Sequence, residues 1–198
     1  KVTDDTLFFE TVSTDSFDYG IDTYDSGYFD EANLISVDDV LDGELRELLS
    51  TCFTKPQDIV FRERRYFKEP PAWRWLMRVD KGRLIGNIAV HNKSVVSGFE
   101  KIPIGGIAEV CVHPDFQKRG LAKEILVTVH EWLAEKQYPF AVLFGNPDVY
   151  TSSGYGRVDN VVRRDREGSE AIRVYPLVKE LGSRSWPRGE VCLFGPGF

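Results

Sequence analysis

The chain has 198 residues, with 42% hydrophobic and 28% charged residues, which is typical of one globular domain with a substantial core. It contains no run of about 18 apolar residues, which argues against a transmembrane helix. Its net charge of −6 argues against a general nucleic-acid binder. Three cysteines without metal-site or disulfide-framework spacing, and a start without the features of a secretory signal, predict a cytoplasmic protein with reduced thiols and no metal.

Residues 1–32 form an acidic and aromatic N-terminal extension. Residues 1–34 contain nine acidic side chains and one lysine, so this segment carries about −8 and the remainder about +2. Its aromatic content is high for a disordered tail, so we expect it to pack, in part as a strand, with an acidic face outward. That face either keeps the surface solvated or attracts a cationic substrate or partner.

The predicted main domain, a single domain over residues 33–198, opens with a short strand at residues 34–37 and a helix. Asp38 or Asp39 is expected to cap this helix. One side of the helix is expected to carry four residues: Leu45, Leu48, Leu49 and Cys52. A second helix is expected over residues 56–66.

Three strands are expected next, as an antiparallel meander. The first two, residues 73–79 and 83–96, are separated by a hairpin turn at residues 80–82. The third covers residues 102–112, after a turn at Gly98.

A strand, a turn and a helix are predicted in succession over residues 107–132. Pro114 ends the strand, and apolar residues recur four apart from Leu121 onward, which predicts a helix over residues 118–136. The first amides of a helix lack intrahelical acceptors and the helix dipole is positive there, so the turn before it can bind a phosphate. Gly120 allows close approach of the backbone. An ordinary solvated turn is the alternative interpretation.

Seven residues of this strand and turn match the pattern V-x-P-x-F-Q-x-[KR]-G-x-A: Val112, Pro114, Phe116, Gln117, Arg119, Gly120 and Ala122. The pattern resembles the acetyl-coenzyme A (acetyl-CoA) signature of the GCN5-related N-acetyltransferase (GNAT) superfamily. The resemblance implies acetyl-CoA as co-substrate, with its pyrophosphate in the turn and its pantetheine arm on the backbone of the strand. The implied cofactor-binding residues are Val110, Cys111, Val112, Gln117, Lys118, Arg119, Gly120, Leu121, Ala122 and Lys123.

A strand at residues 140–144 is followed by a short helix, for which Pro147 suits the start and Gly154 the end. Here Y-x-x-x-G-[FY], from Tyr150 to Tyr155, resembles the second GNAT motif. The resemblance implies that Tyr150 lies near the sulfur of CoA, where a phenol can protonate the departing thiolate. Tyr155 is expected to pack in the core. Many members carry an asparagine seven residues before this tyrosine, whereas Asn146 precedes it by four.

Glu109 is the one acidic residue inside the third strand of the meander, and alternation places it on the same face as Cys111. It is either the base that accepts the proton of the attacking amine or the partner of a basic residue on a neighbouring strand. Cys111 is expected to be a small buried residue rather than an acyl carrier. His113 and His130 are expected at the surface, and His91 on a solvated strand or in the acceptor cleft.

Residues 158–164 and 171–175 are expected to form a hairpin. The ending from Trp186 resembles that of bacterial GNAT proteins related to aminoglycoside 2'-N-acetyltransferase. The order of elements predicts an α/β (α+β) fold with a mostly antiparallel mixed sheet of about six to seven strands flanked by helices, and the resemblance implies the same GNAT-like fold.

The resemblance implies an N-acetyltransferase that transfers acetyl directly to a primary amine of a small acceptor, with Tyr150 as acid and Glu109 as base. The acidic balance favours a cationic acceptor. A longer-chain acyltransferase resembling the nodulation enzymes and a non-catalytic CoA-binding domain are the alternatives. No nucleic acid or membrane is expected as a partner, and a homodimer is compatible with the sequence.

Overall fold

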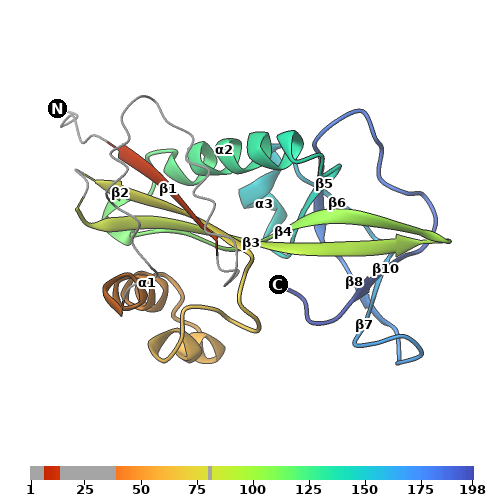
Figure 1. Ribbon diagram of the computed structural model, residues 1–198, viewed down its shortest axis with the longest axis horizontal. Coiled ribbons are helices and arrows are strands. Elements are labelled where there is room, and N and C mark those ends of the chain that lie inside the picture. The colour runs from red at the N-terminus through yellow and green to blue at the C-terminus, as the bar shows by residue number, and fades with distance from the viewer. Residues whose placement is uncertain (1–6, 14–38, 80–81) are drawn as a thin grey trace. The chain divides into compact units, whose positions relative to one another are not determined.

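The computed structural model describes residues 7–13, 39–79 and 82–198 (Figure 1). The predicted strand at residues 34–37, the cap at Asp38 and the first two residues of the turn at 80–82 lie outside this part, as does most of the acidic extension. The chain divides into two compact units, residues 1–89 with 109–125 and residues 90–108 with 126–198.

The first unit contains an antiparallel β-structure and one long helix. Its complete elements are β1 (Leu7–Ser13), α1 (Asp39–Cys52), the 3₁₀ helix η1 (Pro56–Arg62), β2 (Trp73–Val79) and the 3₁₀ turn η2 (Pro114–Phe116). It also contains the first part of β3 (Leu84–Ser97), the end of β4 (Glu100–Val112) and the start of α2 (Leu121–Glu135). β2 pairs with both β1 and β3.

The core of the first unit forms between α1 and the strands, as the spacing of leucines in α1 predicts. Leu45, Leu48 and Leu49 are buried and pack in one cluster with Leu76 of β2 and Leu84 of β3. Figure 1 shows α1 alongside these strands. The expected inward face of this helix is therefore confirmed.

The second predicted helix, residues 56–66, is wrong in length and type, because a 3₁₀ helix occupies only Pro56–Arg62. Phe61 is its one buried residue, so there is no apolar face along which a longer α-helix could pack. Its first turn is held by the Lys55 amide, which donates to the Asp58 carboxylate at 3.0 Å.

The second unit is built on a mixed sheet with the strand order β6-β9-β5-β4-β3-β10-β7-β8. Its further strands are β5 (Phe140–Leu143), β6 (Gly156–Arg157), β7 (Val161–Arg164), β8 (Ile172–Val174), β9 (Leu177–Glu180) and β10 (Val191–Phe194). β5 is parallel to β4, with Ile104 opposite Phe140, and antiparallel to β9. The predicted hairpin is confirmed as β7 and β8.

The predicted α/β fold class, with a mixed and mostly antiparallel sheet flanked by helices, is confirmed. The described residues contain ten strands rather than the expected six to seven, because short strands such as β6 and β9 have too few residues to show a period of two. Two short helices, α3 (Pro147–Tyr150) and the 3₁₀ turn η3 (Thr151–Ser153), follow β5 and end at Gly154, whose φ is +88°.

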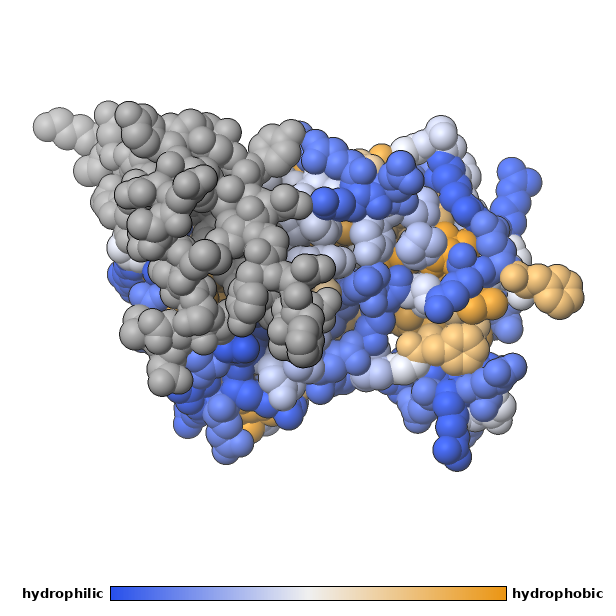
Figure 2. Space-filling view, in the orientation of Figure 1, coloured by the Kyte–Doolittle hydropathy of each residue, from blue (hydrophilic) through white to orange (hydrophobic). Residues whose placement is uncertain are grey.

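On the face shown in Figure 2, the coloured part of the surface is mainly hydrophilic, with apolar side chains between polar ones. Large exposed apolar residues of the described chain include Ile59, Phe99, Val127, Phe144, Val149, Ile172 and Tyr175. None of the helices in the described ranges has the length and hydropathy needed to cross a bilayer. Within those ranges, no three His, Cys, Asp or Glu residues are grouped as a metal site.

Candidate functional site

The turn before α2 presents backbone donors in the arrangement that the sequence predicts. Lys118 and Gly120 have left-handed φ angles of +62° and +83°. The amides of Lys123 and Glu124 both donate to the Gly120 carbonyl, at 2.9 and 3.1 Å. The amides just before Lys123 are those of the first helical residues, which have no acceptor within a helix. The turn therefore directs main-chain N–H groups and the positive end of the α2 dipole outward, as an anion site requires.

The side chains of the turn hold its shape and supply positive charge. Gln117 Nε2 donates to the Val112 carbonyl at 3.0 Å, which ties the turn to the end of β4. The Arg119 guanidinium lies 5.0 Å above the Phe116 ring and donates to the Asp115 carbonyl at 3.2 Å. Three basic side chains of the turn and of the first turn of α2 are exposed: Lys118, Arg119 and Lys123.

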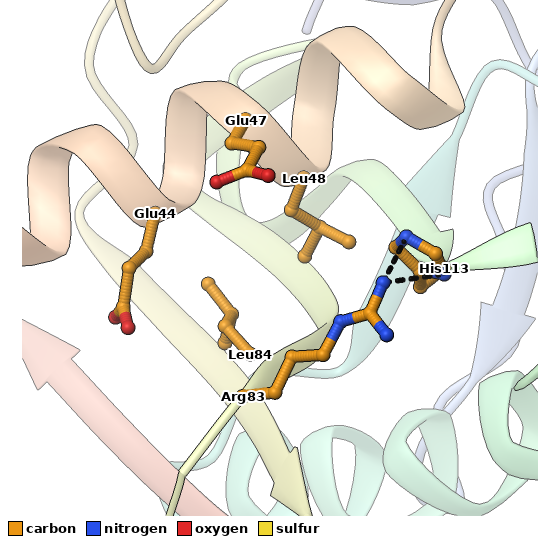
Figure 3. Close-up of a pocket in the computed structure, with 6 residues that line it drawn as sticks. All are labelled: Glu44, Glu47, Leu48, Arg83, Leu84 and His113. Carbon is orange, nitrogen blue, oxygen red and sulfur yellow. Dashed lines mark hydrogen bonds between the residues drawn. The ribbon is translucent and has the colours of Figure 1, made fainter. Parts of the chain in front are cut away.

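A small pocket lies beside the turn, between α1 and the start of β3 (Figure 3). Its lining consists of Glu44, Glu47, Leu48, Arg83, Leu84 and His113. The Arg83 side chain points to His113, with 2.7 Å between Nη2 and Nε2. Carboxylates and a guanidinium line the same pocket, so its charges oppose one another and do not select an ion of one sign.

The end of β4 departs from a regular strand at Glu109, whose φ of +51° is left-handed. The alternation used to place this side chain therefore does not hold there, because a residue in this conformation bends the strand as in a β-bulge. Glu109 Oε2 lies 2.8 Å from Arg74 Nη2 of β2, and both side chains are at most 5% exposed. Glu109 Oε1 accepts a hydrogen bond from the Phe67 amide at 2.8 Å. Of the two roles predicted for Glu109, pairing with a basic residue is the one seen, although Arg74 lies on β2, which pairs with β3 and not with β4.

Cys111 is buried, as expected for a small core residue, and its thiol is hydrogen-bonded to that of Cys52. This hydrogen bond and then burial raise the pKa of Cys111, whereas the same bond lowers the pKa of Cys52. Cys52 Sγ also lies 3.5 Å from the Val112 carbonyl, to which it donates. A thiol with a raised pKa is a poor nucleophile, so the acyl-carrier alternative for Cys111 gains no support.

Tyr150 belongs to the second unit, at the end of α3, and is half-buried. Its ring packs edge-on against Tyr155, with 6.0 Å between ring centroids. A Cβ atom at Gly145 would lie 2.6 Å from the Tyr150 ring, so the glycine leaves room for it. Asn146 caps α3, and its side chain accepts from the Asp148 amide at 3.1 Å, which gives this asparagine a structural role.

Two histidines expected at the surface or on a solvated strand are buried, and those predictions are wrong. His130 is 7% exposed and lies 2.8 Å from the hydroxyl of Tyr155, which is buried as expected. Burial, and then the charge of Lys179, lower the pKa of His130 to about 4. His91 is 4% exposed and stacks on Phe198, with 5.9 Å between ring centroids.

Sequence reasoning missed Arg74 and Asn87, which are fully buried beside Glu109. Arg74 stands between Trp73 and Trp75 in β2, a strand whose one other charged residue is Arg78 near its end. A charge at such a position needs a buried partner, and this was the available signal.

Comparisons with known proteins agree on one family. A family model described as "Acetyltransferase (GNAT) domain" matches residues 42–158, which is more than half of the 198-residue chain. No curated protein matches the chain significantly. The matched range includes the turn before α2, the end of β4 and Tyr150.

Two solved structures similar to this chain are GNAT proteins. One is the GNAT family N-acetyltransferase YhbS from Escherichia coli in complex with CoA, with 19% identity, a TM-score of 0.58 and coverage of 78% of this chain and 83% of that chain. Another is a GNAT family acetyltransferase from Brucella melitensis in complex with acetyl-CoA, with 19% identity, a TM-score of 0.53 and coverage of 75% and 86%. At these identities the structures support the fold. Together with the family model, they show that the chain belongs to the GNAT acetyltransferase family.

Proposed function

We propose that the protein is an N-acetyltransferase that transfers acetyl from acetyl-CoA to a primary amine of a small acceptor. The observation that carries the proposal is the turn before α2, where Lys118 and Gly120 are left-handed and the first helical amides face outward. This geometry suits a diphosphate. The presence of CoA and acetyl-CoA in two structurally similar GNAT proteins supports the same co-substrate.

Each part of the turn has a role in this proposal. The amides from Gly120 to Ala122 bind the pyrophosphate of acetyl-CoA, and the exposed side chains of Lys118, Arg119 and Lys123 add charge-assisted contacts. The backbone of residues 110–112, immediately after the bend in β4, binds the pantetheine arm. Gln117 supports both, because its side chain bridges the turn to the Val112 carbonyl.

The reaction is aminolysis of a thioester. The neutral amine attacks the acetyl carbonyl carbon, a C–N bond forms, the C–S bond breaks and the sulfur leaves as a thiolate. We assign Tyr150 as the acid that protonates this thiolate, because a half-buried phenol at the end of α3 has a proton to give and the absence of a side chain at Gly145 accommodates its ring. The Glu109 carboxylate already accepts from the Phe67 amide and pairs with Arg74, so we leave the amine proton to water.

The acceptor is proposed to be a cationic small molecule. The net charge of −6 favours the approach of a polyamine or an amino sugar over that of an anionic substrate. This choice rests on long-range attraction, and a panel of amines therefore tests it directly.

The test is release of free CoA thiol from acetyl-CoA with a panel of polyamines, aminoglycosides and lysine peptides. Tyr150→Phe should lower kcat by about 10²-fold, the lower end of what a general acid contributes. Tyr175→Phe, which removes a hydroxyl from an exposed tyrosine of the same unit, should leave kcat unchanged.

Three outcomes would overturn parts of the proposal. Unchanged thiol release by Tyr150→Phe would remove the acid assignment. Binding without turnover on every amine would favour the non-catalytic alternative. Faster turnover with long-chain acyl-CoA than with acetyl-CoA would favour the longer-chain acyltransferase.

A further inference from the structure

The left-handed residue in β4 is not a glycine. Glu109 has φ of +51°, a conformation that non-glycine residues rarely adopt because Cβ approaches the backbone. Such a conformation persists where the surrounding contacts hold the residue in it, and residues of this kind are concentrated at functional sites. Residues 110–112, which are proposed to bind the pantetheine arm, follow it directly in the chain.

The contacts that fix Glu109 form a closed ring in the interior of the first unit. Arg74 Nη2 pairs with the Glu109 carboxylate at 2.8 Å, and Arg74 Nη1 donates to Asn87 Oδ1 at 2.9 Å. Asn87 Nδ2 donates to the main-chain carbonyl of Glu109 at 2.8 Å. The ring therefore holds both the carboxylate and the backbone carbonyl of the same residue.

Two further contacts extend the ring to the segment after η1. The Phe67 amide donates to the second carboxylate oxygen of Glu109 at 2.8 Å, and Arg74 donates to the Arg65 carbonyl. Arg74 is 1% exposed and Asn87 is fully buried. Removing either the buried guanidinium or the buried carboxylate would leave the other charge unpaired, which strongly destabilises a folded protein. We therefore expect the contacts of the ring to form or break together.

We infer that the ring of Arg74, Asn87 and Glu109 is a positioning device for the acetyl-CoA thioester. It keeps Glu109 in the left-handed conformation, and this sets the direction of the β4 backbone over residues 110–112. Arg74 and Asn87 act through Glu109 and touch neither substrate. The inference rests on the proposed function, because it assigns the purpose of the ring to acetyl-CoA binding.

Two substitutions of Glu109 separate backbone conformation from carboxylate chemistry. Glu109→Ala and Glu109→Gly both remove the carboxylate, but only glycine adopts positive φ without strain. We expect Glu109→Ala to weaken acetyl-CoA binding by about 10-fold or more and to lower kcat by about 10²-fold, the loss typical of a small misplacement of reacting groups. Glu109→Gly should bind acetyl-CoA more tightly than Glu109→Ala and recover part of kcat.

A double variant and a matched control complete the experiment. Arg74→Met with Glu109→Gln removes both charges and keeps an acceptor for the Phe67 amide, so it should fold and bind acetyl-CoA better than Arg74→Met alone. Glu44→Gln breaks another ion pair of β2, in which Arg78 Nη2 lies 2.6 Å from Glu44 Oε2. This control should leave acetyl-CoA binding unchanged.

Calorimetric Kd values for acetyl-CoA, kcat and thermal unfolding temperatures are measured for each variant. If Glu109→Ala and Glu109→Gly lower kcat equally while both keep the wild-type Kd, the positioning role is refuted. A direct chemical role of the carboxylate is then favoured. If both variants keep the wild-type Kd and kcat but unfold at a lower temperature, the positioning role is refuted and the ring serves stability alone. If the wild type itself does not bind acetyl-CoA, the proposed function fails first and the inference fails with it.

Discussion

The buried pair of His130 and Tyr155 should make the stability of the protein fall in mild acid. His130 has a pKa of about 4 in the folded protein, against an ordinary value of 6.5, because burial and the nearby charge of Lys179 disfavour the imidazolium. Between these pH values the unfolded chain binds a proton that the folded chain excludes. The free energy of unfolding therefore falls as the pH drops from 6.5 to 4, and His130 has little effect above that range.

The size of this effect follows from the pKa difference. At about 1.4 kcal/mol per pH unit, a pKa lowered from 6.5 to about 4 corresponds to a loss of about 3 kcal/mol by pH 4, of which about 2 kcal/mol is lost by pH 5. Such a loss is a large fraction of the stability of a typical domain, about 5–15 kcal/mol. It should therefore be visible in a urea titration.

The assay compares the wild type with His130→Gln by urea unfolding between pH 5 and pH 7.5. Glutamine does not titrate, and its amide can still hydrogen-bond the Tyr155 hydroxyl, which lies 2.8 Å from the imidazole in the wild type. The difference in unfolding free energy between the two proteins should change by about 2 kcal/mol, because other titrating groups cancel. The reasoning would be refuted if the difference in unfolding free energy between the two proteins were independent of pH. It would also be refuted if the imidazole NMR signal of His130 titrated near pH 6.5.

Two further predictions concern packing and thiol chemistry. Gly105→Ala should destabilise the protein by about 1–3 kcal/mol, measured by urea unfolding. The reason is that the new Cβ would lie 2.6 Å from both terminal methyl carbons of the fully buried Leu133. Unchanged stability would mean that the Leu133 side chain has room to move. With a thiol-specific disulfide reagent, native Cys111 should react far more slowly than Cys52, because Cys111 is buried with a raised pKa and Cys52 is half-buried with a lowered one. Equal rates, measured by mass spectrometry of the labelled peptides, would contradict this order.

The elements with a long hydrophobic period could be predicted from sequence. The repeat from Leu121 predicted α2, which begins directly after the left-handed Gly120 and not at residue 118. The leucines of α1 likewise identified its buried face. In both cases the pattern extends over several turns, so local spacing alone specifies the inward side.

The errors arise where a distant residue decides the environment. His91 is buried with Phe198, and His130 with Tyr155, so neither partner lies within the local pattern of its histidine. The bend at Glu109 likewise depends on Arg74, which lies on a different strand. Such pairings require the tertiary structure, because period and propensity describe only near neighbours.

The part of the candidate site that lies in one contiguous segment could be predicted from the sequence, whereas the part that joins distant segments could not. The turn before α2 is a contiguous segment, so its residues and its conformation could be expected together. The ring around Glu109 joins β2, β3 and β4 and has no contiguous pattern. An arginine between two tryptophans of β2 can indicate only that some buried partner exists, and not which residue it is.

The most direct test of the account is calorimetric titration of acetyl-CoA into the wild type and Gly120→Ala. A Cβ at Gly120 meets no atom within 4 Å, so the substitution strains only the backbone, whose φ is +83°. Alanine disfavours this conformation by about 1–2 kcal/mol, so the free turn should relax out of it, and restoring it on binding should weaken the affinity by about 10-fold. Gly43→Ala, in α1 of the same unit and also without a close neighbour, is the matched control and should bind as the wild type does. Binding by the wild type, with a selective loss in Gly120→Ala, is the predicted result. No heat from the wild type, or equal affinity in all three proteins, would contradict the assignment of the turn before α2 as the diphosphate site.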